Sequence, residues 1–145
     1  MAINTSKVVV GGIMATLVQL VVGFVVFQLM LGARFAAEMD AAMPGSTAKM
    51  QANVALSLVG PIVSGFLLAW LYAAMRPRFG AGMKTAVLAA IPVWAAEATV
   101  YLNDVSIGMM SWSTYCIATA VALVMCIASA AVAGVLYKEV GAPGA

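Results

Sequence analysis

TAVLAAIPVWAAEATVYL, Thr85 to Leu102, is an apolar run interrupted by a single charged residue, Glu97. The run is close to the roughly 20 residues that a helix needs to cross the hydrocarbon core of a bilayer. The whole chain shares this character, because 65% of its 145 residues are hydrophobic and 8% are charged, with a mean hydropathy of +1.08. Soluble globular domains do not have such a composition. The stretch therefore predicts a membrane-spanning helix.

The chain contains four runs of this kind: Val8 to Leu31, Val54 to Met75, Thr85 to Leu102 and Ile107 to Tyr137. Each is close to or above the length needed to span a bilayer. The first is longer than the apolar stretch of a signal peptide, which has roughly 7 to 15 residues. We therefore predict one all-α integral membrane domain over residues 1–145, built as a four-transmembrane-helix bundle.

Basic residues predict the orientation of these spans, because Lys and Arg in short loops stay on the cytoplasmic side. With four spans, both termini and the middle loop share one side of the membrane. That side carries Lys7, Arg76, Arg78, Lys84 and Lys138, whereas the other carries Arg34 and Lys49. We therefore expect both termini in the cytoplasm.

The first outer loop, GARFAAEMDAAMPGS from Gly32 to Ser46, is the connection with room for structure of its own. Its larger apolar residues recur every four positions at Phe35, Met39 and Met43. Arg34 and Glu38 have the spacing of an i,i+4 ion pair. The pattern predicts either a short helix at the membrane surface or a continuation of the first span, ended by Pro44 and Gly45. The second outer connection, at residues 103–108, is predicted to be a tight turn.

The two halves of the chain show a weak internal similarity. KVVVGG opens the first helix pair and KTAVLA the second, and the pairs end in AWLYAAM and AGVLYKE. Two parallel helix-pair repeats would be related by an axis along the membrane normal. Helix ends at the cytoplasmic interface also tend to have such residues, so the pattern alone does not establish a duplication.

Four polar residues, one from each span, are expected at a similar depth. Gln19, Ser64, Glu97 and Cys126 each lie twelve or thirteen positions from a basic residue at the cytoplasmic boundary. At about 1.5 Å of rise per residue, this places them roughly 18 to 20 Å deep. The pattern indicates a candidate intramembrane polar site.

Two interpretations of this polar layer remain open. In the first, Glu97 and Gln19 only form a structural hydrogen bond, with Glu97 neutral because burial disfavours its charged form. In the second, Glu97 handles protons or ions, because a charged residue at the membrane centre costs about 2.5 kcal/mol or more and is a functional candidate by default.

Small and polar residues at helical spacing predict the faces that hold the bundle together. They are Gly12, Thr16 and Gly23 in the first span, Ser57 and Gly60 in the second, and Gly134 in the fourth. Small residues allow close approach of two helix backbones in a membrane. Pro61 and Pro92 each remove a backbone donor and are expected to bend their helices.

Several functions lack the residues that they require. The sequence has no histidine, the commonest metal ligand and the commonest general base near neutral pH. Cys116 and Cys126 are too far apart along one helix to form a disulfide or a metal site. The net charge of +2 is spread over short loops, so nucleic acid is not an expected partner. We expect no cofactor, no metal and no enzymatic activity.

The stretch WLYAAMRPRFGAGMKTAV, Trp70 to Val87, carries a resemblance to a known type of protein. A Leu-Tyr helix end, an Arg-Pro-Arg-Phe-Gly turn and a Lys-Thr-Ala restart resemble a signature of small uncharacterised bacterial four-helix membrane proteins. Leu136 to Lys138 repeats the Leu-Tyr end on the last helix. The resemblance implies a location in the bacterial inner membrane and implies no activity.

Arg76, Arg78 and Lys84 gather at the cytoplasmic surface of this turn. Basic residues near anionic lipid gain roughly 1 kcal/mol each. The three residues are therefore candidates for contact with lipid headgroups, or with the acidic surface of a partner.

Two function classes follow from these features. The first is a non-catalytic accessory or scaffold subunit that packs against other membrane proteins or against copies of itself, which the short loops and the missing catalytic residues favour. The second is a small homo-oligomeric transporter or channel that uses the layer around Glu97. Because four helices enclose little space, the second class requires an oligomer.

Overall fold

The computed structural model describes residues 3–52 and 54–137 of the chain, and these form helices joined by short turns. Lys138, which we assign to the cytoplasmic side, lies outside the described residues. The helices are α1 Thr5–Gly23, η1 Phe24–Met30, α2 Gly32–Ala42, α3 Ser46–Ala52, α4 Val54–Ser57, α5 Val59–Phe79, α6 Met83–Ser106 and α7 Trp112–Leu136. The described part of the chain contains no strand. The predicted all-α fold is confirmed.

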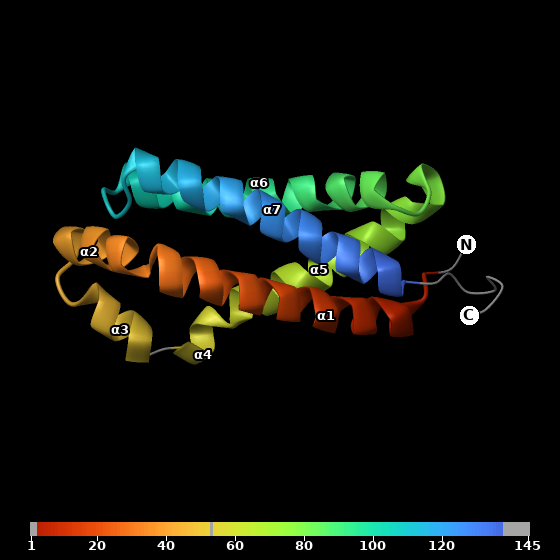
Figure 1. Cartoon of the computed structure of the whole chain (residues 1–145), viewed down its shortest axis with the longest axis horizontal. Coiled ribbons are helices and arrows are strands. Elements are labelled where there is room, and N and C mark those ends of the chain that lie inside the picture. The colour runs from red at the N-terminus through yellow and green to blue at the C-terminus, as the bar shows by residue number, and fades with distance from the viewer. Residues whose placement is uncertain (1–2, 53, 138–145) are drawn as a thin grey trace.

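Four helical segments are long and apolar enough to cross a membrane: Thr5–Val26, Val54–Phe79, Met83–Ser106 and Trp112–Leu136. They correspond to the four predicted spans. The start of α1, the end of α7 and the turn between α5 and α6 lie at one end of the bundle (Figure 1), as four crossings require. We call this the inner end, and the opposite end the outer end.

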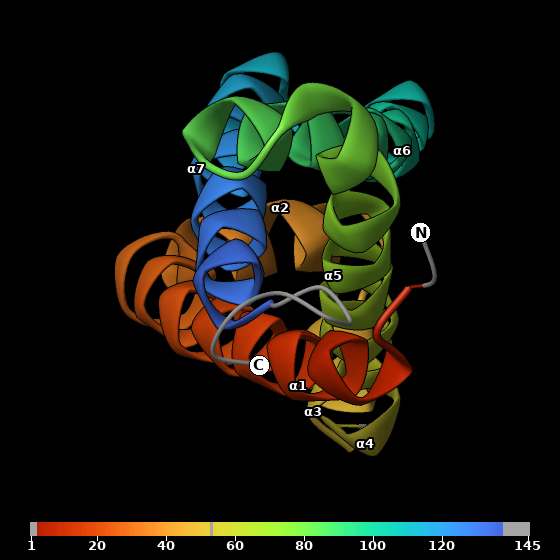
Figure 2. The same cartoon turned by 90° about the vertical axis from the view of Figure 1, so that its right-hand side faces the viewer.

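The four long helices form a bundle in which α1 and α6 lie on opposite sides (Figure 2). Each of them packs against both α5 and α7. All four spans therefore border the interior, and residues at the same depth on each span can meet there. Whether α1 with α5 and α6 with α7 are repeats of one ancestral pair stays a prediction.

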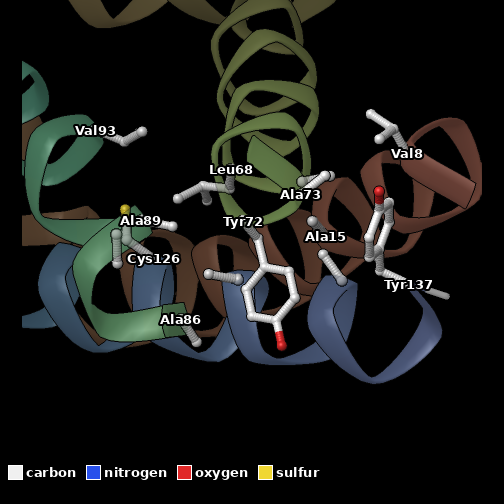
Figure 3. Packing of buried hydrophobic residues seen from close by; sticks show 14 residues of the cluster. Val8, Ala15, Leu68, Tyr72, Ala73, Ala86, Ala89, Val93, Cys126 and Tyr137 are labelled. Carbon is white, nitrogen blue, oxygen red and sulfur yellow. The ribbon is translucent and has the colours of Figure 1, made fainter. Parts of the chain in front are cut away.

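The interior is packed mainly with small side chains. Ala15, Ala86 and Ala89 have no exposed surface, and they belong to one cluster with the larger Leu68 and Tyr72 of α5 (Figure 3). Large apolar residues face outward instead, as at Val21, Leu29, Val124 and Val135. This distribution suits a bilayer, where helices associate by close packing rather than by withdrawing apolar surface from water.

Three glycines permit the closest helix contacts. A Cβ atom on Gly12 would lie 2.7 Å from the ring of Phe66, and one on Gly134 would lie 2.5 Å from the ring of Tyr72. A Cβ atom on Gly65 would lie 2.7 Å from the backbone nitrogen of Thr16. Phe66 of α5 therefore packs partly against α1.

The first apolar span ends at Val26, before the predicted Leu31, whereas the helical structure continues beyond that residue. Its helix widens to π geometry over η1, where the backbone N–H of Leu31 donates to the carbonyl of Val26 at 2.8 Å. It then resumes as α2. The first outer loop therefore contains a short helix, α2, and its place at the membrane surface stays a prediction. Met43, with an extended backbone, ends α2, and Gly45, with φ +81°, lies in the turn before α3.

The middle turn begins later than its sequence suggests. The second span extends past Met75 to Phe79, so Arg76 to Phe79 form the last helical turn rather than a loop. Pro77 lies inside this last turn, where it lacks the backbone N–H that would bond the carbonyl of Ala73. Gly80 and Gly82, with φ +84° and +124°, make the reversal.

The outer ends of the last two spans also differ from the prediction. Asn103 to Ser106 belong to α6, so the predicted tight turn lies at residues 107–111 instead. Gly108 has φ +78° there. Ile107 is therefore the C-cap of α6 rather than the first residue of the fourth span. A turn this short needs a residue with a left-handed backbone conformation, which glycine adopts most easily, and Gly108 provides it.

Candidate functional site

One chain of hydrogen bonds joins the four residues of the candidate polar site. Gln19 on α1 donates from Nε2 to Ser64 Oγ on α5 at 2.8 Å. Ser64 Oγ donates in turn to Glu97 Oε1 on α6 at 2.8 Å. Cys126 on α7 donates from Sγ to Glu97 Oε2 at 3.5 Å. Each span therefore contributes one polar side chain to the same connected group.

Burial differs along this hydrogen-bonded chain. Gln19 is 2% exposed, Ser64 8% and Cys126 0%, whereas Glu97 is half-buried. The first three hold the interior contacts between helices. Glu97 is the most exposed of the four, and a molecule from outside the bundle can reach it.

Glu97 lines a groove between α5 and α6, which has a volume of about 460 Å³ and is partly open to the outside. The walls are mostly apolar, with Leu67, Val93, Val100 and Met125 among the lining residues. Gly60 of α5 and Ala96 of α6 also line it. Because these two residues have little or no side chain, they leave space between the helices.

Both membrane prolines lie on this groove as well. Pro61 is in the first turn of α5, three positions after Leu58, where the helix is interrupted. A proline cannot donate the backbone bond that would join α5 to α4. Pro92 lies within α6, five residues before Glu97. In the second span, the helix is therefore interrupted between α4 and α5, beside the groove, where we predicted a bend. The bend of α6 at Pro92 stays a prediction.

The carboxylate of Glu97 has acceptor capacity left for another group. An ionised carboxylate offers about four lone-pair sites, and Ser64 and Cys126 occupy one on each oxygen. Among the described residues that line the groove, none is basic. Glu97 therefore has no counter-ion on the groove walls, and it can pair with a positively charged group.

The described residues contain no group of three or more His, Cys, Asp or Glu side chains placed to hold a metal ion. The sequence expectation of a protein without metal or cofactor stays a prediction.

A second polar cluster, at the outer end, was missed in the sequence. Glu38 on α2 accepts from the backbone N–H of Ser111 at 2.9 Å and from the Thr114 hydroxyl at 2.8 Å. Ser111 is the N-cap of α7, so Glu38 supplies a carboxylate to the start of a helix 73 residues further along the chain. Arg34 pairs with Glu38 at 3.2 Å, as its spacing predicted, and also bonds Ser113.

Hydrogen bonds control the ionisation of Glu38. Partial desolvation acts to raise its pKa, but bonds from Ser111, Thr114 and Arg34 outweigh this and lower the pKa from 4.5 to about 2. Asp40 is used similarly, because it accepts from the backbone N–H of Thr47 at 3.0 Å in the first turn of α3, and its pKa is lowered. Both carboxylates lie at the N-terminus of a helix, where the partial positive charge of the helix end stabilises their negative charge.

Comparison with known proteins assigns the chain to a family. The model of a family described as "Protein of unknown function (DUF1761)" matches residues 10–134. The chain belongs to the DUF1761 family. The matched region of this DUF1761 member includes Gln19, Ser64, Glu97 and Cys126. No curated protein and no solved structure matches the chain. Membership of an uncharacterised family agrees with the resemblance seen in the sequence.

The basic residues at the inner end of this DUF1761 member have different surroundings. Arg76 donates to the backbone carbonyl of Tyr137 at 2.6 Å, and its guanidinium lies 5.4 Å from the centre of the Tyr137 ring. It therefore holds the end of α7 against α5. Arg78, beside the ring of Phe79, and Lys84 are exposed. These two are the residues that remain available to lipid headgroups or a partner.

The candidate packing residues of this DUF1761 member also divide into two groups. Gly12, Thr16 and Gly134 lie at helix contacts. Around Gly23 and Gly60, no atom of the described residues outside the local helix lies within 4 Å of an added Cβ atom. Ser57 is exposed and bonds the carbonyl of Val54 in its own helix. The helical spacing of small residues in the sequence therefore identified candidates for packing, but it did not predict which of them face a neighbouring helix.

Proposed function

We propose that this protein is a small non-catalytic membrane transporter, working as a homo-oligomer, whose solute or coupling ion uses the polar layer at Glu97. The observation that carries the proposal is the convergence of Gln19, Ser64 and Cys126, from three different helices, on a carboxylate that lines an open groove. A structural hydrogen bond alone would not need an accessible carboxylate.

The energetics of membrane proteins support this role. A carboxylate in a membrane span is costly, and such residues usually face a pathway or a partner. Here the acid is in contact with interior polar groups on one side and with the groove on the other. A group in this position can exchange a proton or a cation between the groove and the interior. Val63, Leu67 and Val100 line the groove and are exposed, so an adjoining copy packed against them would enclose the pathway.

Flux measurements with purified protein in sealed vesicles test the proposal. A pH gradient should drive proton movement in vesicles that contain the wild-type protein, and Glu97→Gln should abolish it. Asp104→Asn is the matched control, because it neutralises another acid of the same helix that lies outside the polar layer. Equal flux from wild-type and Glu97→Gln vesicles would overturn the proposal.

A second candidate is the accessory or scaffold subunit. The observation in its favour is the exposure of Arg78 and Lys84 at the inner end, where they can contact the acidic surface of another membrane protein. The mass of the native assembly, purified in mild detergent without overexpression, separates the candidates. Foreign subunits in fixed proportion would support the accessory role, and a homo-oligomer would support the transporter.

We also propose that the protein lies in a bacterial inner membrane with both termini in the cytoplasm. Lys7, Arg76, Arg78 and Lys84 belong to the inner end of the bundle, whereas Arg34 and Lys49 belong to the outer end. This asymmetry supports a cytoplasmic inner end. A reporter fused after Ala145 should be active in the cytoplasm, and activity only outside the cytoplasm would contradict the orientation.

A further inference from the structure

The groove between α5 and α6 combines one acid with apolar walls. Glu97 is the acidic residue among those that line it, and no basic residue described there neutralises it. The rest of the lining is mainly aliphatic. An occupant that matches this surface needs one positive charge and an apolar body.

The dimensions of the groove suit a small organic molecule. Its volume of about 460 Å³ lies within the roughly 300 to 1,000 Å³ that is usual for ligand pockets. The opening lets such a molecule enter from the surrounding bilayer without crossing a polar loop. An apolar body would also replace lipid chains against Leu67, Val93 and Val100.

Tyr101 adds a second feature that favours a cation. It lines the groove four positions after Glu97, so the two side chains lie on the same face of α6. An aromatic ring attracts a positive charge within about 6 Å of its centre, and organic ammonium groups are recognised in this way. The carboxylate and the ring can therefore act on the same charged group.

We propose that this groove binds a lipophilic organic cation, such as an amine or onium compound with an apolar body, whose charge is placed against Glu97. The proposal deepens the proposed function, because it names the class of solute for the same site. Binding neutralises a carboxylate that otherwise has no counter-ion on the groove walls.

Other occupants fit the groove less well. Ca²⁺ prefers about six to eight oxygen ligands, and the lining supplies few oxygen atoms besides those of Glu97, Ser64 and Gln19. A neutral lipid chain would cover the apolar walls but leave the carboxylate of Glu97 without a counter-ion. An anion would be repelled by the carboxylate.

Two probes of the same shape and opposite charge test the proposal. Tetraphenylphosphonium is a lipophilic cation, and tetraphenylborate is the corresponding anion. Equilibrium dialysis of each probe against the full chain in lipid nanodiscs, with empty nanodiscs subtracted, measures specific binding. We expect saturable binding of tetraphenylphosphonium and no saturable binding of tetraphenylborate.

Variants connect this binding to the groove. Glu97→Gln should weaken binding of the cation by about tenfold or more, because it removes the negative charge that pairs with the cation in the groove. Ala96→Phe should weaken it similarly by filling the groove, without changing any charge. Asp104→Asn should bind like the wild type. Thermal unfolding of each variant confirms that it is folded.

The outcomes separate this inference from the proposed function. Equal binding of the two probes, or equal binding of the cation by wild type and Glu97→Gln, would overturn the inference. If no probe binds but Glu97→Gln still abolishes proton flux, the solute class is wrong and the transporter role stands. If the cation binds at Glu97 without any flux, the site stands and the transporter role falls.

Discussion

Ser64 Oγ on α5 and Glu97 Oε1 on α6 are joined by a 2.8 Å hydrogen bond within the membrane-spanning part of the bundle. The same Ser64 oxygen accepts the side-chain amide of Gln19 from α1. One hydroxyl group therefore connects three of the four spans. The carboxylate at the end of this chain is held in a fixed position on the wall of the groove.

Ser64→Ala should destabilise the protein by about 1 to 3 kcal/mol, because a buried donor on Gln19 loses its acceptor. Denaturation in detergent measures the change. Ser57→Ala is the matched control in the same span, since Ser57 is exposed and bonds only within its own helix. It should change stability by less than about 0.5 kcal/mol. Equal effects of the two substitutions would contradict the role of Ser64.

Gly65→Ala should destabilise the bundle by about 1 to 3 kcal/mol, because the added methyl group meets the backbone of Thr16 and the helices must separate. Gly23→Ala should be neutral or slightly stabilising, since the described residues leave open space there and alanine favours a helix. Thermal unfolding of both variants in the same detergent measures the difference. A stable Gly65→Ala variant would show that α1 and α5 are less closely packed.

Glu38 should make stability depend on pH at the outer end. Its pKa in the folded protein, about 2, lies below the ordinary value of 4.5, so its ionised form stabilises the fold at neutral pH. This contribution is lost as the pH falls from about 4.5 to about 2. The difference in melting temperature between wild type and Glu38→Gln should therefore be largest near pH 7 and shrink in that range. A difference that stays constant with pH would contradict it.

Arg76 and Arg78 should have separable effects. Arg76→Gln should destabilise the protein by about 1 to 2 kcal/mol, because it removes a charged donor from the carbonyl of Tyr137. Arg78→Gln should leave unfolding nearly unchanged and instead weaken binding to vesicles that contain anionic lipid. Unfolding and vesicle flotation of both variants give the two readouts. Loss of stability in Arg78→Gln alone would reverse the assignment.

The four spans, and the common level of the four polar residues along the bundle, were predictable from the sequence. Membrane helices have a fixed rise per residue, and basic residues mark one end of each span, so position along the chain translates into depth. This argument placed Gln19, Ser64, Glu97 and Cys126 at one level, and the structure joins them. Their use in transport stays a proposal.

Direction and long-range contacts were less predictable. Gly60 and Gly134 look equivalent in sequence, yet the first lines the groove and the second packs against Tyr72. Rotation about a helix axis depends on all of its neighbours together, and a spacing pattern does not determine it. The contact of Glu38 with Ser111 joins segments 73 residues apart, and only the packing of α2 beside the start of α7 reveals it.

The most direct test of the central claim compares proton flux in vesicles that contain either the wild-type protein or Glu97→Gln, with tetraphenylphosphonium present on one side. The account predicts that the cation increases proton movement in the wild type above the movement that a pH gradient alone drives, and that the variant shows no proton movement. Identical flux in both, from protein shown to be folded and equally incorporated, would contradict a functional role for Glu97.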